Sequence, residues 1–309
     1  MSTIWVFPGQ GAQHPNMLHD LPQHHLVQHY IQQASDVLDQ DVLLLDQPDA
    51  LKSTYAVQIC LYIAGVVSAA LLQEHAGQPQ FVAGLSIGAW AAATTAKVIT
   101  FEDGLKLVAK RGQLMQEAYP SGYGMTAILG ADQARVEMWV NAVKSTHAEV
   151  YIANINTETQ IVISGEINAM QAVGSLAQQN GAVCKKVEIS VPSHCELLTQ
   201  QAQQLATMME GIRTQQPSIK YLSGTSARVL PTDRQIVDDI VFNMCRMIRW
   251  DNTVRAAWER GARLHIEALP GNVLTGLAKK TFKEGTVLSF QNTQLESLMT
   301  AMHIQQGCI

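Results

Sequence analysis

Charged side chains are scarce in this sequence, and neither sign dominates. Only 15% of the 309 residues are charged, and 21 basic against 26 acidic side chains leave a formal net charge of -5. Proteins that bind nucleic acid or anionic membranes usually do so with a strongly basic surface. The composition therefore offers no electrostatic basis for either partner. With 47% hydrophobic residues, it is typical of a compact enzyme.

Cysteines are few and show no ligand-type spacing. The five are Cys60, Cys184, Cys195, Cys245 and Cys308. An odd, scattered set supports neither a disulfide framework nor a cysteine metal site, so we expect a reduced, cytoplasmic protein.

The N-terminus also lacks the basic region of a secretory signal, and residues 4–7 read as a first strand. The adjacent His24 and His25 are isolated, and we interpret them as part of a solvated helix face rather than a metal site.

One apolar run is long enough to be tested as a membrane span. Residues 55–72 are almost continuously apolar, and about 20 such residues cross a bilayer. Gln58 and Ser68 interrupt the run, Gly65 lies in its middle, and no cluster of Lys or Arg follows it. We therefore expect a buried helix and no membrane partner.

Strand and helix signals alternate through most of the chain. Before residue 125, we expect helices over 23–38, 55–74 and 101–119, with strands over 4–7 and 81–83. Residues 125–191 instead show the order β-α-β-β-α-β, which is typical of a ferredoxin-like unit. We predict an α/β fold in which a large α/β-hydrolase-like domain with a parallel sheet, 1–124 and 192–309, carries this smaller ferredoxin-like domain as an insertion.

The most informative motif is Gly84-Leu85-Ser86-Ile87-Gly88, which follows an apolar strand and precedes a helix-like stretch, 89–98. Strand, Gly-x-Ser-x-Gly and helix form the setting of a nucleophile elbow, where a sharp turn exposes the serine. The start of the helix offers free N–H groups and a positive dipole end to an oxyanion. The pattern alone is common, but this setting favours a covalent serine enzyme with Ser86 as nucleophile.

A serine nucleophile needs a base, and the ten histidines supply candidates. His194 lies in the segment 191–195, where the small unit returns to the large domain. A boundary loop can reach across a cleft between domains, and such clefts host active sites. Spacing alone leaves two interpretations open, a general base and a structural histidine.

Arg111 is unusual because the helical period places it on an apolar face. At ~100° per residue it falls in the middle of the group that contains Leu107 and Met115. A guanidinium in such a place keeps its proton and needs an anionic partner or water. Either Arg111 pairs with a buried Asp or Glu, or it binds the carboxylate of a substrate. The second interpretation would indicate a dicarboxylic acyl group.

Gln10 lies in the loop after the first strand. In a doubly wound sheet that loop is at the carboxyl edge of the strands, where ligands bind. Its amide could donate to an oxyanion beside the N–H of Ile87. On local grounds a plain turn explains the segment equally well.

These residues belong to six ordered blocks that span almost the whole chain. The blocks are Phe7-Pro8-Gly9-Gln10-Gly11-Ala12-Gln13, Gly84-x-Ser86-x-Gly88, Arg111-Gly112-x-x-Met115-Gln116, Asn154-x-Asn156-x-x-x-Gln160-Ile161-Val162-Ile163-Ser164-Gly165, Pro192-Ser193-His194-Cys195 and Pro270-Gly271-x-x-Leu274-x-Gly276-Leu277. With them the chain resembles the malonyl-CoA:acyl-carrier-protein transacylase family. The resemblance implies two partners, malonyl-CoA and an acyl carrier protein. It implies no bound cofactor, because the acceptor thiol belongs to the carrier's prosthetic group.

The resemblance also assigns roles to the reacting groups. Ser86 would be the acylated nucleophile and His194 its base, while Arg111 would hold the malonyl carboxylate. Gln10 and the N–H of Ile87 would form the oxyanion hole.

Further positions follow from the same resemblance. Asn154 and Asn156 would line the cleft from the small domain, and Leu85 and Met115 would contact the substrate. The family orients its histidine with a backbone carbonyl, which we assign to Arg249. That would leave a Ser-His dyad without a third acid.

Two positions depart from the family. Leu85 and Ala89 stand where the family usually has His and Glu. With the segment 119–125, they resemble the branch found as the epsilon subunit of malonate decarboxylase, which would add other subunits of that complex as partners. Three alternatives stay open: a transacylase of fatty-acid or polyketide synthesis, a serine thioesterase or hydrolase, and a non-catalytic assembly subunit.

Overall fold

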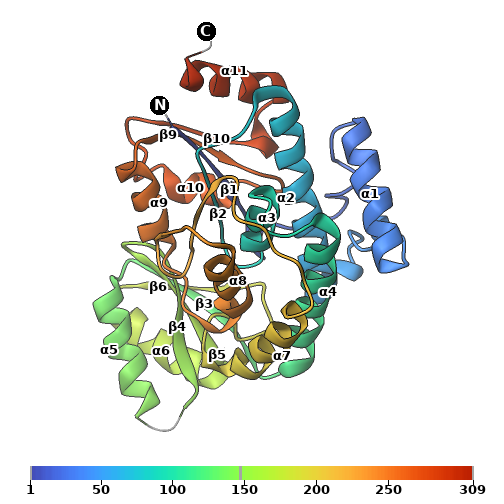
Figure 1. The fold of residues 1–309 in the computed structure, drawn as a ribbon. Coiled ribbons are helices and arrows are strands. Elements are labelled where there is room, and N and C mark those ends of the chain that lie inside the picture. The colour runs from blue at the N-terminus through green and yellow to red at the C-terminus, as the bar shows by residue number, and fades with distance from the viewer. Residues whose placement is uncertain (1, 146–147, 308–309) are drawn as a thin grey trace.

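Two β-sheets organise the protein. The computed structural model describes residues 2–145 and 148–307 (Figure 1). All four cysteines among these residues have free thiols; Cys308 lies outside the described residues. The α/β fold class predicted from the sequence is confirmed, with one mostly parallel sheet and one separate antiparallel sheet.

The larger sheet has six strands. Across the sheet they are β10 (Thr286–Ser289), β9 (Ala262–Glu267), β1 (Ser2–Phe7), β2 (Phe81–Gly84), β7 (Lys220–Leu222) and β8 (Val229–Leu230). Neighbours pair in parallel except β8, which is antiparallel to β7. Alternate residues of β1 pack into different cores, Trp5 and Phe7 on one face, Ile4 and Val6 on the other. Burial on both faces is typical of a parallel sheet covered by helices.

Nine helices of the described residues belong to the larger unit. They are α1 (His25–Leu38), α2 (Thr54–Ala76), α3 (Gly88–Thr95), α4 (Phe101–Ala118), α7 (Thr199–Met209), α8 (Asp233–Phe242), α9 (Trp250–Glu259), α10 (Val273–Ala278) and α11 (Leu295–Gln306). Short 3-10 turns cover Val42–Leu44, Ala50–Lys52, Glu196–Leu198, Asn243–Cys245 and Phe290–Asn292. Helix α4 begins after Thr100, whose side chain accepts from the N–H of Asp103, the usual way to satisfy a free donor at a helix start.

Helix α2 contains the long apolar run. It is long and apolar enough to cross a membrane, but 89% of its most apolar window is buried inside the protein. Gly65 allows close packing there, since a Cβ at this position would lie 3.0 Å from Ala91 and 3.2 Å from Phe7. The helix is therefore part of the core, as the interruptions of the run predict.

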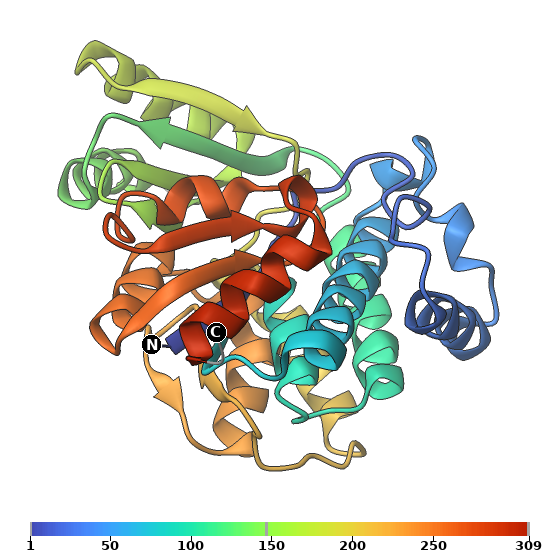
Figure 2. The same ribbon diagram turned by 90° about the horizontal axis from the view of Figure 1, so that it is seen from above.

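The smaller sheet is antiparallel. Its order is β4 (Val150–Thr157), β5 (Gln160–Glu166), β3 (Tyr123–Leu129) and β6 (Val183–Val187). Helices α5 (Gln133–Lys144) and α6 (Ile167–Gln179) complete the predicted order β-α-β-β-α-β. The boundary that we predict at residue 125 falls inside β3. Figures 1 and 2 show this unit on the opposite side of the molecule from helix α1.

Candidate active site

Ser86 lies at the turn between β2 and α3. Its φ of 56° is in the left-handed region, which is uncommon for a residue with a side chain. The flanking glycines make this turn sterically accessible. A Cβ at Gly84 would lie 2.0 Å from the carbonyl carbon of Gly88, and one at Gly88 would lie 2.1 Å from the carbonyl oxygen of Phe7. The local sequence therefore builds the strained strand-to-helix turn that a nucleophile elbow requires.

A cavity of about 230 Å³ lies in front of Ser86. Both units contribute to its walls. Leu85 and Gln10 come from loops of the larger unit, and Asn154 and Asn156 come from strand β4. His194, on the segment that connects the two units, completes the wall. The structure thus gathers most of the predicted site residues around one space.

The His194 ring is held by a backbone carbonyl. The ring Nδ1 is 2.6 Å from the carbonyl oxygen of Asn243. The backbone N–H of His194 donates to the carbonyl of Met244 at 2.7 Å. A carbonyl oxygen can only accept, so Nδ1 carries the proton and Nε2 is left as the basic atom. Burial lowers the pKa of His194 to about 4, and the Arg111 charge also lowers it, while the Asn243 carbonyl acts in the opposite direction. The imidazole is therefore neutral at pH 7.

The prediction that Arg249 supplies this carbonyl is wrong. Arg249 directly precedes helix α9, and its carbonyl accepts from the N–H of Thr253 at 3.0 Å. Its own N–H donates to Gly224 at 2.7 Å. The short turn at Asn243–Cys245 brings the Asn243 carbonyl to the imidazole instead.

Arg111 is fully buried beside Ser86. Its Nη2 donates to Ser86 Oγ at 3.3 Å and to Asn243 Oδ1 at 3.2 Å, and its Nη1 donates to Gln58 Oε1 at 2.6 Å. Its Nε has no hydrogen-bond partner among the residues that the structure describes. Burial lowers the pKa of Arg111 to about 9, so the side chain stays charged at neutral pH.

No Asp or Glu within the described ranges forms an ion pair with Arg111. All three of its side-chain partners are uncharged. Of the two interpretations that the sequence leaves open, the internal salt bridge is therefore wrong. Among the described residues the site therefore holds a buried cation with neutral hydrogen-bond partners only.

Asn243 contacts each of the three central residues, yet nothing in its local sequence predicts this. Its carbonyl meets His194, its Oδ1 meets Arg111, and its Nδ2 donates to the carbonyl of Ser86 at 3.1 Å. The sequence analysis also does not predict that Gln58 contacts Arg111. A polar residue inside the apolar run of helix α2 is a signal from which a buried polar contact could have been predicted.

Ser86 and His194 line the same cavity without being hydrogen-bonded to each other in the described part of the chain. In this arrangement Oγ accepts from Arg111 instead. Hydrogen bonds of a catalytic pair are often long before substrate binds, so this geometry is compatible with a base at Nε2.

Comparison with known proteins agrees with this geometry. The profile of the family described as "Acyl transferase domain" matches residues 4–307. Malonyl CoA-acyl carrier protein transacylase of Haemophilus influenzae is 36% identical over 285 residues, which cover 89% of this chain and 90% of that protein. The chain belongs to the malonyl-CoA:acyl-carrier-protein transacylase family.

Solved structures of this transacylase family share the fold along the whole chain. FabD from Acinetobacter baumannii has a TM-score of 0.94 at 30% identity, over 98% of this chain and 99% of that one. A chain from the complex of a type II PKS acyl-carrier protein with its malonyl-transacylase has a TM-score of 0.90 at 33% identity, over 98% and 100%.

Of the other residues to which the transacylase resemblance assigns a role, some line the cavity in front of Ser86 and some do not. Gln10 lines the cavity, and Ile87 is the residue before helix α3, so its N–H lies outside the helical ladder. The side-chain oxygens of Asn154 and Asn156 are buried and have no hydrogen-bond partner within residues 2–145 and 148–307. Met115 is not among the residues that line the cavity. It lies behind Arg111, where its sulfur accepts from Gln58 Nε2 at 3.3 Å.

Proposed function

We propose that this protein transfers a malonyl group from malonyl-CoA to the thiol of an acyl carrier protein, with malonyl-Ser86 as the intermediate. One observation carries the proposal: a fully buried guanidinium without a carboxylate partner among the described residues lies 3.3 Å from Ser86 Oγ. An unpaired buried charge is costly, so a substrate carboxylate is a fitting partner. The names of the relatives agree with this substrate.

In the first step, Ser86 Oγ attacks the thioester carbonyl while His194 Nε2 takes the hydroxyl proton. The carbonyl oxygen becomes an oxyanion, to which the Ile87 N–H and the Gln10 amide donate. One such donor contributes about 3 kcal/mol to the stability of the transition state. The C–S bond then breaks, and the proton on His194 passes to the departing CoA thiolate.

The second step reverses these events with another thiol. The carrier thiol gives its proton to His194 and attacks the malonyl-Ser86 carbonyl. The C–O bond to Ser86 breaks, and Oγ regains a proton from His194. Arg111 holds the distal carboxylate through both steps and converts binding into orientation of the reacting carbonyl. The proposed chemistry uses side chains and backbone donors, with no bound cofactor.

The shape of the protein surface supports a long thioester substrate. A second cavity, of about 720 Å³, shares Gln10, Met125 and Ile189 with the one in front of Ser86. The two cavities are therefore neighbours between the larger unit and the small sheet. Their adjacency suits a pantetheine arm that delivers its acyl end to Ser86.

For the acceptor, we propose the carrier protein of a malonate decarboxylase system in the cytoplasm. Leu85 and Ala89 support this choice, since they replace the His and Glu usual in the family. Leu85 lines the cavity, and Ala89 is buried at the start of helix α3. The alternative acceptor is a carrier of fatty-acid or polyketide synthesis, which suits the names of the relatives equally well.

Intact-mass spectrometry after mixing with malonyl-CoA tests the proposal. We expect one malonyl group on the wild-type protein and none on Ser86→Ala. A chase with purified carrier proteins of each system should remove the label, fastest with the preferred acceptor. A label that water removes as quickly as a carrier does would instead identify a hydrolase, and a wild-type protein that never acquires the label would indicate a non-catalytic subunit.

A further inference from the structure

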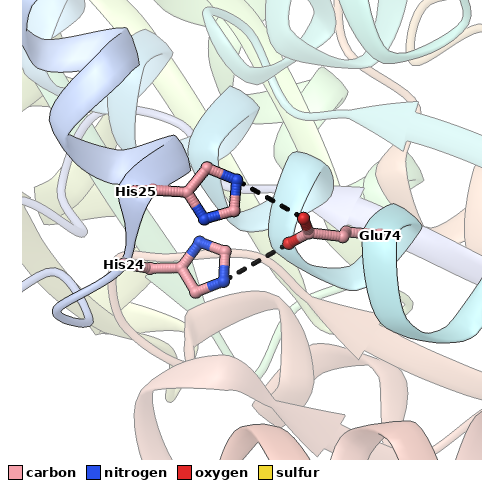
Figure 3. A group of neighbouring side chains, drawn as sticks. All are labelled: His24, His25 and Glu74. Carbon is pink, nitrogen blue, oxygen red and sulfur yellow. Dashed lines mark ion pairs between the residues drawn. The ribbon is translucent and has the colours of Figure 1, made fainter.

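We propose that His24, His25 and Glu74 form a binding site for a divalent transition metal ion of the zinc class, with His75 beside it. His24 and His25 lie at the start of helix α1, and Glu74 and His75 lie in the last turn of helix α2. Figure 3 shows the imidazole rings of His24 and His25 turned toward the two oxygens of the Glu74 carboxylate. None of these residues lines the cavity in front of Ser86.

Each of the two imidazole nitrogens lies at a tetrahedral ligand spacing from one oxygen of Glu74, His24 from Oε2 and His25 from Oε1. His24 Nε2 is 3.3 Å from Glu74 Oε2, and His25 Nε2 is 3.5 Å from Glu74 Oε1. With metal–ligand bonds of about 2.0–2.2 Å, two ligands of a tetrahedral ion are separated by roughly 3.3–3.6 Å. The three ligand atoms all lie within 4.8 Å of one another. Only small side-chain movements would be needed to place one ion between them.

A third histidine lies beside the cluster, outside the set of ligand atoms that are all within 4.8 Å of one another. His75 Nε2 is 3.6 Å from Glu74 Oε2, and its ring meets that of His24 edge-on at 5.6 Å between centroids. Imidazole nitrogens with one carboxylate suit zinc, copper or nickel, whereas calcium and magnesium prefer sites made of oxygen atoms. These ligand atoms therefore favour zinc, copper or nickel over calcium or magnesium.

Binding would cost one weak hydrogen bond. His24 Nδ1 accepts from the N–H of Leu26 at 3.3 Å, which is long for such a bond. A metal ion on Nε2 requires the ring proton to be on Nδ1, where it would oppose this contact. Because the bond is long, its loss is small compared with the formation of metal–ligand bonds.

The site would add a link between two helices that already belong to one hydrophobic core. Val27 and Ala34 of helix α1 are buried in that core, and Leu26, Tyr30, Ile31, Val37 and Leu38 are partly buried against it. An ion bound between the first residues of helix α1 and the end of helix α2 would add a further attachment to the core helix. The predicted solvated face agrees with the exposure of the two side chains, 22% for His24 and 70% for His25, but their chain neighbours alone do not reveal Glu74 beside them.

Metal titration of the full-length protein tests this site. After treatment with a chelator, Zn²⁺ is titrated at pH 7.5 against a chromogenic competitor. We expect one site in the wild-type protein, and at least about tenfold weaker binding in His25→Gln and Glu74→Gln. His29→Gln is the matched control, since His29 is an exposed histidine of the same helix outside the cluster. It should bind Zn²⁺ like the wild type.

Thermal unfolding gives a second readout. An ion that binds only the folded protein raises the melting temperature. Zn²⁺ should therefore raise the melting temperature of the wild type and His29→Gln, but not that of His25→Gln. Zn²⁺ affinities that are equal in His25→Gln, Glu74→Gln and the wild type would overturn the proposal. A wild-type protein that binds no Zn²⁺ would also do so, leaving the cluster as ion pairs between histidines and Glu74.

Discussion

Arg111 Nη2 donates to Ser86 Oγ across 3.3 Å, so the buried positive charge touches the atom that is proposed to carry the acyl group. An acyl chain attached to Oγ therefore begins beside the guanidinium. A malonyl group is short, and its distal carboxylate can reach the same cation from the attached end. This relationship connects substrate choice to the position of the nucleophile.

Removal of this charge should reduce malonyl transfer far more than acetyl transfer. Loss of one partner of a buried charge pair typically costs about 2–5 kcal/mol, so we expect malonyl kcat/KM of Arg111→Ala to fall on the order of 10²- to 10³-fold. Acetyl transfer lacks the carboxylate contact and should change much less. Lys106→Ala, an exposed cation of the same helix, is the control. An unchanged malonyl-to-acetyl ratio in Arg111→Ala would exclude the carboxylate role.

A carboxylate introduced beside Arg111 should compete with the substrate. Asn243→Asp keeps the backbone carbonyl that meets His194 and places an acidic oxygen at the position of Oδ1, which is 3.2 Å from Nη2. We expect the KM for malonyl-CoA to rise by about tenfold or more, since the internal ion pair must be displaced. Steady-state kinetics measure this change. Gln113→Glu, which adds the same charge on the exposed face of helix α4, should leave KM unchanged.

The activity should be insensitive to pH across the neutral range. Burial lowers the pKa of His194 to about 4, so the free base is present throughout pH 5–8. Burial lowers the pKa of Arg111 only to about 9, so its charge is also retained there. The pH profile of kcat/KM reports groups of the free enzyme. It should be flat between pH 5 and 8, and an acidic limb centred near 6.5 would show that His194 is not buried in this way.

A second buried histidine should make stability depend on pH. His265 is fully buried, neither ring nitrogen has a hydrogen-bond partner in the described part of the chain, and burial lowers its pKa to about 3. The unfolded chain takes up a proton near pH 6.5, whereas the folded protein does not. The stability from neutral His265 is therefore present above pH 6.5 and is lost as the pH falls toward 3.

Urea unfolding at pH 7 and pH 4.5 can isolate this effect. From the two pKa values, His265 should account for a loss of free energy of unfolding on the order of 3 kcal/mol between these pH values. His265→Leu removes the titrating group and should show a correspondingly smaller loss. His303→Leu, in which a histidine of helix α11 is replaced, is a control that retains His265. An equal loss in the wild type and His265→Leu would contradict the assignment.

The predictions for secondary structure hold best where the signal is local. Helix α4 lies where the sequence predicts a helix, and the alternation of the middle segment predicts each strand and helix of the small unit. The position of Arg111 on an apolar face follows from the helical period alone. Errors are confined to element ends, where β3 begins at Tyr123. The first residue of β3 is set by its pairing with the neighbouring strand, where Tyr123 is opposite Glu166, and not by the segment itself.

Motif spacing alone determined the strand-turn-helix at Ser86, because glycine at 84 and 88 is a local steric requirement. Tertiary structure decided which carbonyl faces His194, that Arg111 has only uncharged partners, and that Glu74 lies against His24 and His25. Each of these contacts joins residues far apart in the chain. Their distances follow from how helices and sheets pack, and periodicity along one segment carries no information about that packing.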